Sequence, residues 1–379
     1  MARKSVICAF TLTFLLISFA VTSVQADYQS GLNAYEAGDY ETAYSELLPE
    51  ADKGHAQAQY TLGVLYFNGT GVPQDYNEAV KWMRKAAEQG IAPAQHNLGK
   101  MYIDGHGVSQ DYSEAVKWIQ KAAKQGHTEA QFNLAYMYDS GKGISQNYRK
   151  AVKWLRKAAE QGHPEALLIL AEKYYAGEGV SQSYSQAAKW YLKAAEQGIA
   201  GAQHNLGDMY ELGKGVPKDF SKAAKYYGMA AEQGDAGSQY MLAGLYLTGS
   251  LDLPQNFEKA VEWCRKAVEQ GHADAQDSLG VMYEKGQGVL QDYSEAFKWY
   301  KKAAEQGNAN AQNHIGALYT NGLGFPQNFV LAYMWFDLAA SNGDEYAEKN
   351  ILVISEVMTR VQIEEGKKLA REWREQHNK

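Results

Sequence analysis

Histidine and cysteine are the residues of this chain best suited to binding a metal or acting as nucleophiles. Four of the nine histidines share one position, directly after a glycine that recurs along the chain: His55, His127, His163 and His272. Successive members of this series would lie about one repeat apart, and no carboxylate or cysteine recurs beside them. A ladder of metal ions is the weaker interpretation, and we expect neither a metal nor another cofactor.

Motifs of known catalytic machinery are missing from the sequence. It has no Ser-x-x-Lys, Cys-x-x-Cys or His-Glu-x-x-His, so serine β-lactamase and standard zinc signatures are absent. Its Gly-x-Gly loops, such as Gly69/Gly71, never continue into Gly-Lys-Ser/Thr, and their recurrence indicates turns between helices. Cys264 shares its repeat position with apolar residues, which predicts a buried, inert thiol. The sequence predicts no enzyme.

The overall composition is that of an ordinary globular protein. The 379 residues are 45% hydrophobic and 21% charged, with seven prolines, which excludes a disordered or collagen-like chain. The net charge of -7 argues against a general nucleic-acid-binding protein, which needs a basic face.

The first 26 residues have the organisation of a secretory signal peptide. Arg3 and Lys4 precede an apolar run over residues 6–21, and small residues surround Ala26. We expect cleavage after Ala26, a mature protein starting at Asp27 and no integral membrane span afterwards. The alternative is an uncleaved anchor over residues 5–24, which approaches the length of a membrane span. The sequence thus predicts export to the periplasm or beyond.

A repeat of 36 residues extends over nearly all of the remaining chain. Glycine recurs at this interval, once lengthened to 37, at positions 54, 90, 126, 162, 198, 234, 271, 307 and 343. Such self-similarity is typical of solenoids built from stacked supersecondary units. We expect eight copies over 55–343, preceded by a shortened capping copy over 27–54.

Each copy reads as two antiparallel helices. In the first helix, Ala58, Leu62 and Tyr66 follow the spacing of one buried face. The second should begin at an N-cap residue, namely Asp75, Asp111, Asn147, Ser183, Asp219, Asn256, Asp292 and Asn328. Glu78, Glu114 and Glu295 would complete capping boxes. The repeated tryptophans equivalent to Trp82 and tyrosines equivalent to Tyr66 are interpreted as core, and the repeated glutamines equivalent to Gln59 as hydrogen bonds between copies.

The repeat resembles the Sel1-like repeat family, relatives of tetratricopeptide solenoids. The shared pattern is A-x-x-x-L-G-x-x-Y-x-x-G-x-G-V-x-x-D-Y-x-x-A-x-x-W, and it recurs over residues 55–343. The resemblance implies an all-α, right-handed α/α superhelical solenoid whose first helices line a concave surface that holds other proteins. Family members act as adaptors in degradation and signalling, and secreted bacterial members serve the envelope or contact host cells. This chain lacks the cysteines of the secreted branch named for β-lactamase-like activity.

The last 36 residues, 344–379, depart from the repeat. Thr359-x-x-Gln362 can begin a final helix that carries Ile363, Leu369 and Trp373. A closing helix with a polar back would shield the last apolar face of a solenoid, so we expect capping helices here. A partner-binding tail is the alternative.

The positions that vary between copies indicate where a partner could bind. On the first helix, positions 60, 64 and 67 lie on one face, opposite Leu62 and Tyr66, and the fold does not dictate their identity. This face is aromatic and aliphatic in the first four copies, as protein interfaces are. The predicted partner-binding residues are Tyr60, Phe67, His96, Lys100, Phe132, Tyr136, Tyr175, His204, Asp208, Glu211 and Tyr240. Drift of a solvent-facing surface, or contact between successive first helices, would explain the variation equally.

These observations predict an exported, non-enzymatic scaffold that binds a protein or peptide in its concave groove. We expect a monomer that binds no nucleic acid. A hydrolase or binder acting on peptidoglycan or β-lactams is the alternative, and turnover of a chromogenic β-lactam would reveal it. A membrane-associated degradation adaptor is a third interpretation, which requires the uncleaved anchor.

Overall fold

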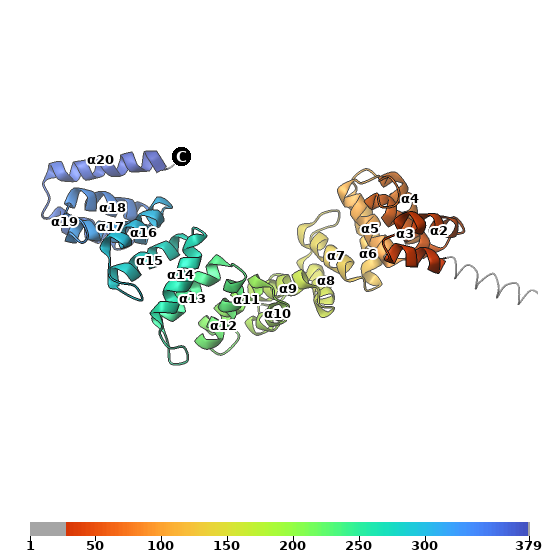
Figure 1. The fold of residues 1–379 in the computed structure, drawn as a ribbon, viewed down its shortest axis with the longest axis horizontal. Coiled ribbons are helices and arrows are strands. Elements are labelled where there is room, and N and C mark those ends of the chain that lie inside the picture. The colour runs from red at the N-terminus through yellow and green to blue at the C-terminus, as the bar shows by residue number, and fades with distance from the viewer. Residues whose placement is uncertain (1–27, 378–379) are drawn as a thin grey trace, which may run out of the picture. The chain divides into compact units, whose positions relative to one another are not determined.

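The computed structural model describes residues 28–377, and all regular structure within that range is helical. The predicted signal peptide, residues 1–26, lies outside the described residues. The chain divides into two compact units at Ser183/Tyr184. The first unit opens with helical residues 28–36 and continues with α2 Tyr40–Asp52, α3 Ala56–Asn68, α4 Tyr76–Glu88, α5 Ala92–Asp104, α6 Tyr112–Lys124, α7 Thr128–Ser140, α8 Tyr148–Glu160 and α9 Pro164–Ala176 (Figure 1).

The second unit repeats the same arrangement and ends with two further helices. Its helices are α10 Tyr184–Glu196, α11 Ala200–Leu212, α12 Phe220–Glu232, α13 Ala236–Thr248, α14 Phe257–Glu269, α15 Ala273–Lys285, α16 Tyr293–Glu305, α17 Ala309–Asn321, α18 Phe329–Ser341, α19 Ala347–Ser355 and α20 Arg360–His377. In both units each helix packs against the next one along the chain, except that α20 packs against α18. The molecule is therefore an all-α solenoid, as predicted.

The second helix of each copy begins at the predicted N-cap residue. Asp75 Oδ1 accepts hydrogen bonds from the N–H groups of Asn77 and Glu78, at 2.8 and 3.1 Å. The predicted capping boxes are wrong, however. The backbone N–H of Asp75 donates to the carbonyl of Tyr66, and the Glu78 carboxylate turns to Lys81 instead. Glu114 and Glu295 behave in the same way, pairing with lysines three residues further on.

The Gly-x-Gly loops join the two helices of a copy and also contact the preceding copy. The first glycine ends the first helix in the left-handed region, as Gly69 does at φ 70°. The second glycine lies against the backbone at the start of the preceding second helix. A Cβ atom on Gly288, for example, would come within 2.5 Å of the carbonyl oxygen of Phe257. Glycine is needed here because two chain segments pass this close, in addition to its positive φ.

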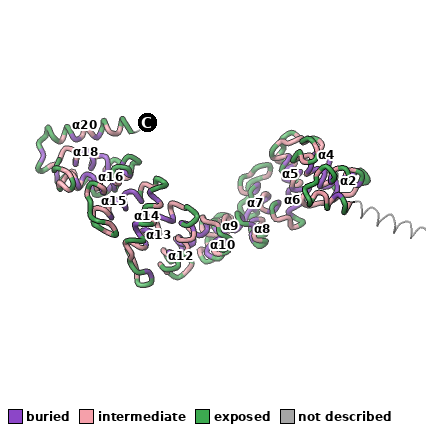
Figure 2. The backbone as a smooth tube through the Cα atoms, viewed as in Figure 1, coloured by how far each residue is buried: buried purple, intermediate pink, exposed green. Residues whose placement is uncertain are grey.

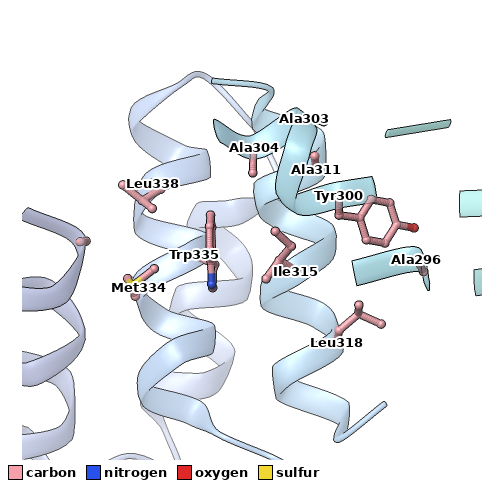
Figure 3. Packing of buried hydrophobic residues seen from close by; sticks show 11 residues of the cluster. Ala296, Tyr300, Ala303, Ala304, Ala311, Ile315, Leu318, Met334, Trp335 and Leu338 are labelled. Atoms are coloured by element: carbon pink, nitrogen blue, oxygen red, sulfur yellow. The ribbon is translucent and has the colours of Figure 1, made fainter. Parts of the chain in front are cut away.

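The core lies between the helices, while the loops are exposed (Figure 2). Small pairs such as Ala86 and Ala87 are fully buried and let neighbouring helices approach closely. Figure 3 shows one such cluster, with Ile315 and Trp335 between α17 and α18. The tryptophan position is only partly core. Trp82 and Trp335 are buried, whereas the other tryptophans are half-buried and a lysine one turn later covers the ring, as Lys266 Nζ covers Trp263 at 3.8 Å.

The repeated glutamines hydrogen-bond between copies, as predicted. Gln59 Nε2 donates to the Ala51 carbonyl at 2.9 Å, and its Oε1 accepts from Gln89 Nε2 at 2.8 Å. The side chain is buried, and both of its polar ends have partners. The glutamine thus holds the end of one copy against the start of the next.

The C-terminal helices α19 and α20 both pack against α18. Thr359 and Gln362 form the reciprocal capping box that the sequence predicted for the start of α20. The Trp373 ring meets Trp335 edge-on at 5.6 Å, and Arg374 Nη1 lies 2.9 Å from Asp337 Oδ2. Within residues 28–377 no helix is both long enough and apolar enough to cross a membrane.

Candidate partner-binding face

The predicted interface comprises the side chains equivalent to Tyr60, Val64 and Phe67 on every first helix, which we call the first-helix face. The structure gives these three positions different roles. The Tyr60 position is occupied by contacts between consecutive copies. The Val64 and Phe67 positions form the accessible part of the face.

Side chains at the Tyr60 position contact the first helix of the following copy. Tyr60 is half-buried against the core cluster that contains Leu98 of α5, and His96 Nε2 lies 2.8 Å from Asn133 Nδ2. The contact between successive first helices, left open by the sequence, is therefore present. The expectation that His96 is exposed is wrong, because its ring packs between α5 and α7 and is 8% exposed. Burial, with His127 and Lys100 nearby, lowers the pKa of His96 to about 4.

Aromatic rings at the same position also stack on the repeated histidines. Phe132 lies 4.3 Å from the ring of His163, and Tyr240 lies 5.0 Å from that of His272. These histidines cap the first helices: Nδ1 of His163 accepts the N–H of Ala166 at 3.3 Å. Phe132 and Tyr240 are half-buried by this packing. The histidines thus have a structural role that explains their recurrence.

In the first unit, the accessible part of the first-helix face combines aromatic and aliphatic side chains with charges of both signs, since it carries Asp139 and the exposed Glu172 as well as Lys100. Tyr136 on α7 is 55% exposed, and Lys100 on α5 is exposed as well. Phe67 on α3 and Tyr175 on α9 are half-buried at the third position of the face. Phe67 and Lys100 also line a pocket between α3 and α5. Four predicted residues thus share this face within one unit.

In the second unit, the same positions carry an acidic cluster around a buried tyrosine. The Tyr227 hydroxyl lies 2.5 Å from Asp208 Oδ1 and 2.7 Å from Glu211 Oε2. Burial and these two carboxylates raise the pKa of Tyr227 far above its usual range, so the phenol keeps its proton. His204 is half-buried and held by Ser238, with Nδ1 to Oγ at 2.8 Å. Asp208 and Glu211 are therefore engaged by the protein's own side chain.

One further repeat position, which lies beneath the first-helix face, was not predicted to contribute to the site. It belongs to the apolar series of Met83, Tyr227 and Tyr300, and the Tyr300 hydroxyl lies 2.7 Å from Glu284 Oε2. A signal was available, since tyrosine stands at this position in the copies whose first-helix face carries Glu211 or Glu284. A phenol surrounded by apolar side chains needs an acceptor, and those carboxylates supply it.

The residues suited to chemistry do not gather into one site. No three or more His, Cys, Asp or Glu side chains between residues 28 and 377 are arranged to hold a metal ion. Cys264 is fully buried, as predicted, and its Sγ lies 3.0 Å from the Ala275 carbonyl oxygen. Burial raises the pKa of Cys264 to about 12, so the reactive thiolate is not formed at neutral pH.

The fold and the face define an all-α repeat protein of stacked helix pairs that presents a patterned surface on its first helices. Comparison with protein families matches the Sel1 repeat at 56–91, 92–127, 128–163, 164–199, 200–235, 236–272, 273–308 and 309–344. The chain belongs to the Sel1 repeat family. Proteins of this family bind protein partners.

Two solved bacterial structures are similar over much of the chain. One is c5321, a protective antigen present in uropathogenic Escherichia coli strains and displaying an SLR fold. It is 35% identical, with a TM-score of 0.64, over 93% of this chain and 84% of that one. The other is a Sel1 repeat protein from Oxalobacter formigenes, 36% identical with a TM-score of 0.53, over 64% of this chain and 96% of that one.

Curated relatives match only locally. DAP3-binding cell death enhancer 1 of Rattus norvegicus and that of Mus musculus are each 35% identical over 69 residues. The match covers 16% of this chain and 14% of each relative.

Proposed function

We propose that this protein is an exported, non-enzymatic scaffold that binds a protein or peptide partner through the first-helix face of its first unit. The observation that carries the proposal is the exposure of Tyr136 and Lys100 at positions that the packing of the copies does not use. Tyrosine is enriched at interface hot spots because its rigid ring buries a large area at a small cost in entropy.

We propose that only a subset of the predicted interface residues contacts the partner. Tyr60, His96, Phe132, His204 and Tyr240 serve contacts between copies, so we assign them a supporting role. Phe67, Lys100, Tyr136 and Tyr175 are the contact residues that we propose. Asp208 and Glu211 already bond to Tyr227, so a partner there would compete with an internal hydrogen bond.

Export rests on the sequence of residues 1–26 and on one similar protein. The structurally similar c5321 is described as a protective antigen, and that description supports export here. Mass measurement of the protein isolated from its own cells tests the proposal. A mature start at Asp27 supports export with cleavage, whereas a chain beginning at residue 1 contradicts it.

Affinity capture with matched variants tests the binding function. Three purified proteins would be immobilised: the wild type, a Tyr136→Ala/Lys100→Ala variant and a Tyr346→Ala control. Each would be incubated with an extract of the source cells and with their culture medium. Tyr346 is 65% exposed on α19 and so matches Tyr136 in exposure. We expect the double variant to bind the captured partner about 10- to 100-fold more weakly, because two hot-spot side chains are lost.

The control separates a specific loss from a general one. Tyr346→Ala should bind as the wild type does, and circular dichroism should show equal helix content in all three proteins. Equal capture by the double variant would place binding on another face. Failure of the wild type to retain any protein would overturn the scaffold function.

A further inference from the structure

A pocket of about 240 Å³ opens on the first-helix face between α3 and α5. Its apolar lining consists of the buried Met83 and Met101 and the half-buried Val64 and Phe67, and Asn68 and Asn97 add polar groups. The exposed side chains Lys100 and Asp104 stand at its mouth. An apolar pocket with charged residues at its opening is suited to a ligand that inserts an apolar group and keeps its polar groups at the opening.

Comparison with the other copies explains why space is left at this point. In the fifth copy, Tyr227 takes the place of Met83, its ring lies against Gly207, and its hydroxyl reaches the first-helix face. In the seventh copy Tyr300 does the same against Gly280, with the hydroxyl at the outer end of the side chain (Figure 3).

The first copy has the same glycine without the aromatic ring. Met83 lies against Gly63, and a methionine is too short and too slender to fill the volume that a tyrosine occupies. The first and fifth copies thus differ in the side chain that lies against this glycine. The chain fills the equivalent space with its own ring at Tyr227, whereas beside Met83 the space is open to an outside side chain.

The size and chemistry of the pocket specify that side chain. An apolar cavity of about 150 Å³ is enough to bind benzene, so this pocket has room for one phenyl or branched aliphatic group. A guest enters from the mouth, so its tip meets Met83 and Met101. Sulfur–aromatic contacts favour a phenyl ring there.

The mouth of the pocket fits a peptide backbone. Lys100 and Asp104 lie one turn apart on α5, and neither forms an ion pair with any residue from 28 to 377. The ammonium can donate to a carbonyl oxygen and the carboxylate can accept from an N–H group. A peptide presents both groups on either side of each side chain.

We propose that this pocket binds one phenylalanine or leucine side chain of an extended peptide segment from a protein partner, with Lys100 and Asp104 bonding the flanking peptide groups. The inference rests on the proposed scaffold function and specifies the anchor that the partner must carry. Tyr136 on α7 is exposed on the same face of the unit and would contact the segment further along.

Selection from a random peptide library displayed on phage tests this assignment on the full protein. We expect enriched peptides to share one phenylalanine or leucine. In synthetic peptides, replacing that anchor by alanine should weaken binding about 10- to 100-fold, measured by fluorescence anisotropy.

A larger side chain at position 83 should fill the pocket and so test whether the peptide binds there. Met83→Phe places a ring where Phe336 already lies against Gly316 in the last copy, and Gly63 provides the same room. The variant should fold normally and bind the selected peptides about 10- to 100-fold more weakly. Phe336→Leu changes the same repeat position at the other end of the chain and should bind as the wild type does.

A spectroscopic measurement gives an answer independent of the folding of any variant. With methyl-labelled methionine, the resonances of Met83 and Met101 in the wild type should shift when a selected phenylalanine peptide is added. Unshifted methyl groups at saturating peptide would overturn the pocket assignment.

The outcomes distinguish failure of the pocket from failure of the scaffold function. Peptides whose binding survives Met83→Phe but is lost in Tyr136→Ala would overturn the pocket and leave the scaffold function standing. Enriched peptides without a shared apolar anchor would also overturn the pocket. Absence of any enriched peptide, together with an empty affinity capture, would overturn both.

Discussion

The repeated histidines act as hydrogen-bond acceptors at the starts of the first helices. His55 Nδ1 accepts the N–H of Ala58 at 3.2 Å, and His127 Nδ1 accepts that of Ala130 at the same distance. A protonated imidazole has no free lone pair for such a bond, so the cap requires the neutral ring. Burial lowers the pKa of His127, which keeps the ring neutral, although Glu129 acts in the opposite direction.

His96 should make the stability of the protein depend on pH. Its pKa is about 4 in the folded protein, against an ordinary value of 6.5. Between these values the unfolded chain binds a proton that the folded chain does not. The stabilisation is therefore complete above pH 6.5 and is lost as the pH falls, by about 3 kcal/mol at pH 4.

Urea unfolding of the wild type and of His96→Gln at pH 7 and pH 4.5 checks this expectation. Glutamine keeps a hydrogen-bonding group that can reach Asn133 but does not titrate. The free energy of unfolding of the wild type should fall more between the two pH values than that of the variant. Equal losses would show that His96 does not control the acid sensitivity.

The loops between helices are the elements that fix the spacing of the copies. In each Gly-x-Gly loop, the first glycine ends a helix and the second lies against the preceding copy. The glycine at the end of the second helix differs, since a Cβ on Gly271 would have nothing within 4 Å despite a φ of +82°. Gly271 and the second glycine of a loop, such as Gly288, thus have similar φ angles, but only the second glycine lies against another chain segment.

Two alanine substitutions separate the cost of backbone conformation from that of packing. Gly271→Ala should lower the free energy of unfolding by about 1–2 kcal/mol, the penalty of a left-handed alanine. Gly288→Ala carries the same penalty and also places Cβ against the Phe257 carbonyl. It should therefore lower the free energy of unfolding by about 1–3 kcal/mol more than Gly271→Ala does. Thermal and urea unfolding measure both variants, and equal costs would contradict the close contact.

At the scale of the whole molecule, stability is the sum of contacts between neighbouring helices. Each helix within a unit packs chiefly on the elements beside it in sequence, apart from α20, which returns to cover α18. Solenoids of this kind respond to a change mainly near its position. The last copy depends on α20, because that helix covers Trp335 and Leu338.

Removal of residues 360–379 should loosen the end of the second unit and leave the first unit unchanged. We expect faster amide hydrogen exchange in α17 and α18, with protection of α3 to α7 kept, because the contacts of α20 are local. Arg374→Ala removes only a partly exposed ion pair to Asp337 and should cost less than about 1 kcal/mol. Lost protection in α3 to α7 would show long-range coupling instead.

The candidate face could be located from the sequence, but its accessible residues could not be chosen. Positions 60, 64 and 67 all vary between copies, and helical periodicity places them on one side. Whether a varying residue faces solvent or a neighbouring copy depends on the offset between first helices. That offset packs Tyr60 against the core cluster that contains Leu98 of the following copy and leaves Tyr136 exposed.

The sequence by itself determined the helices, their order and their stacking, because a repeat imposes the same local signals on every copy. Apolar spacing, N-cap residues and glycines act over a few residues, so they can be read without knowing the partners. Only the tertiary structure showed that Glu78 pairs with Lys81 and does not form a capping box, and that His96 is buried. It also showed a pocket beside Met83, at the position where the fifth copy has the ring of Tyr227. Glu78 turns away because the Tyr66 carbonyl already accepts the Asp75 N–H, whereas the burial of His96 and the pocket depend on side chains far apart in the chain, whose distances packing alone sets.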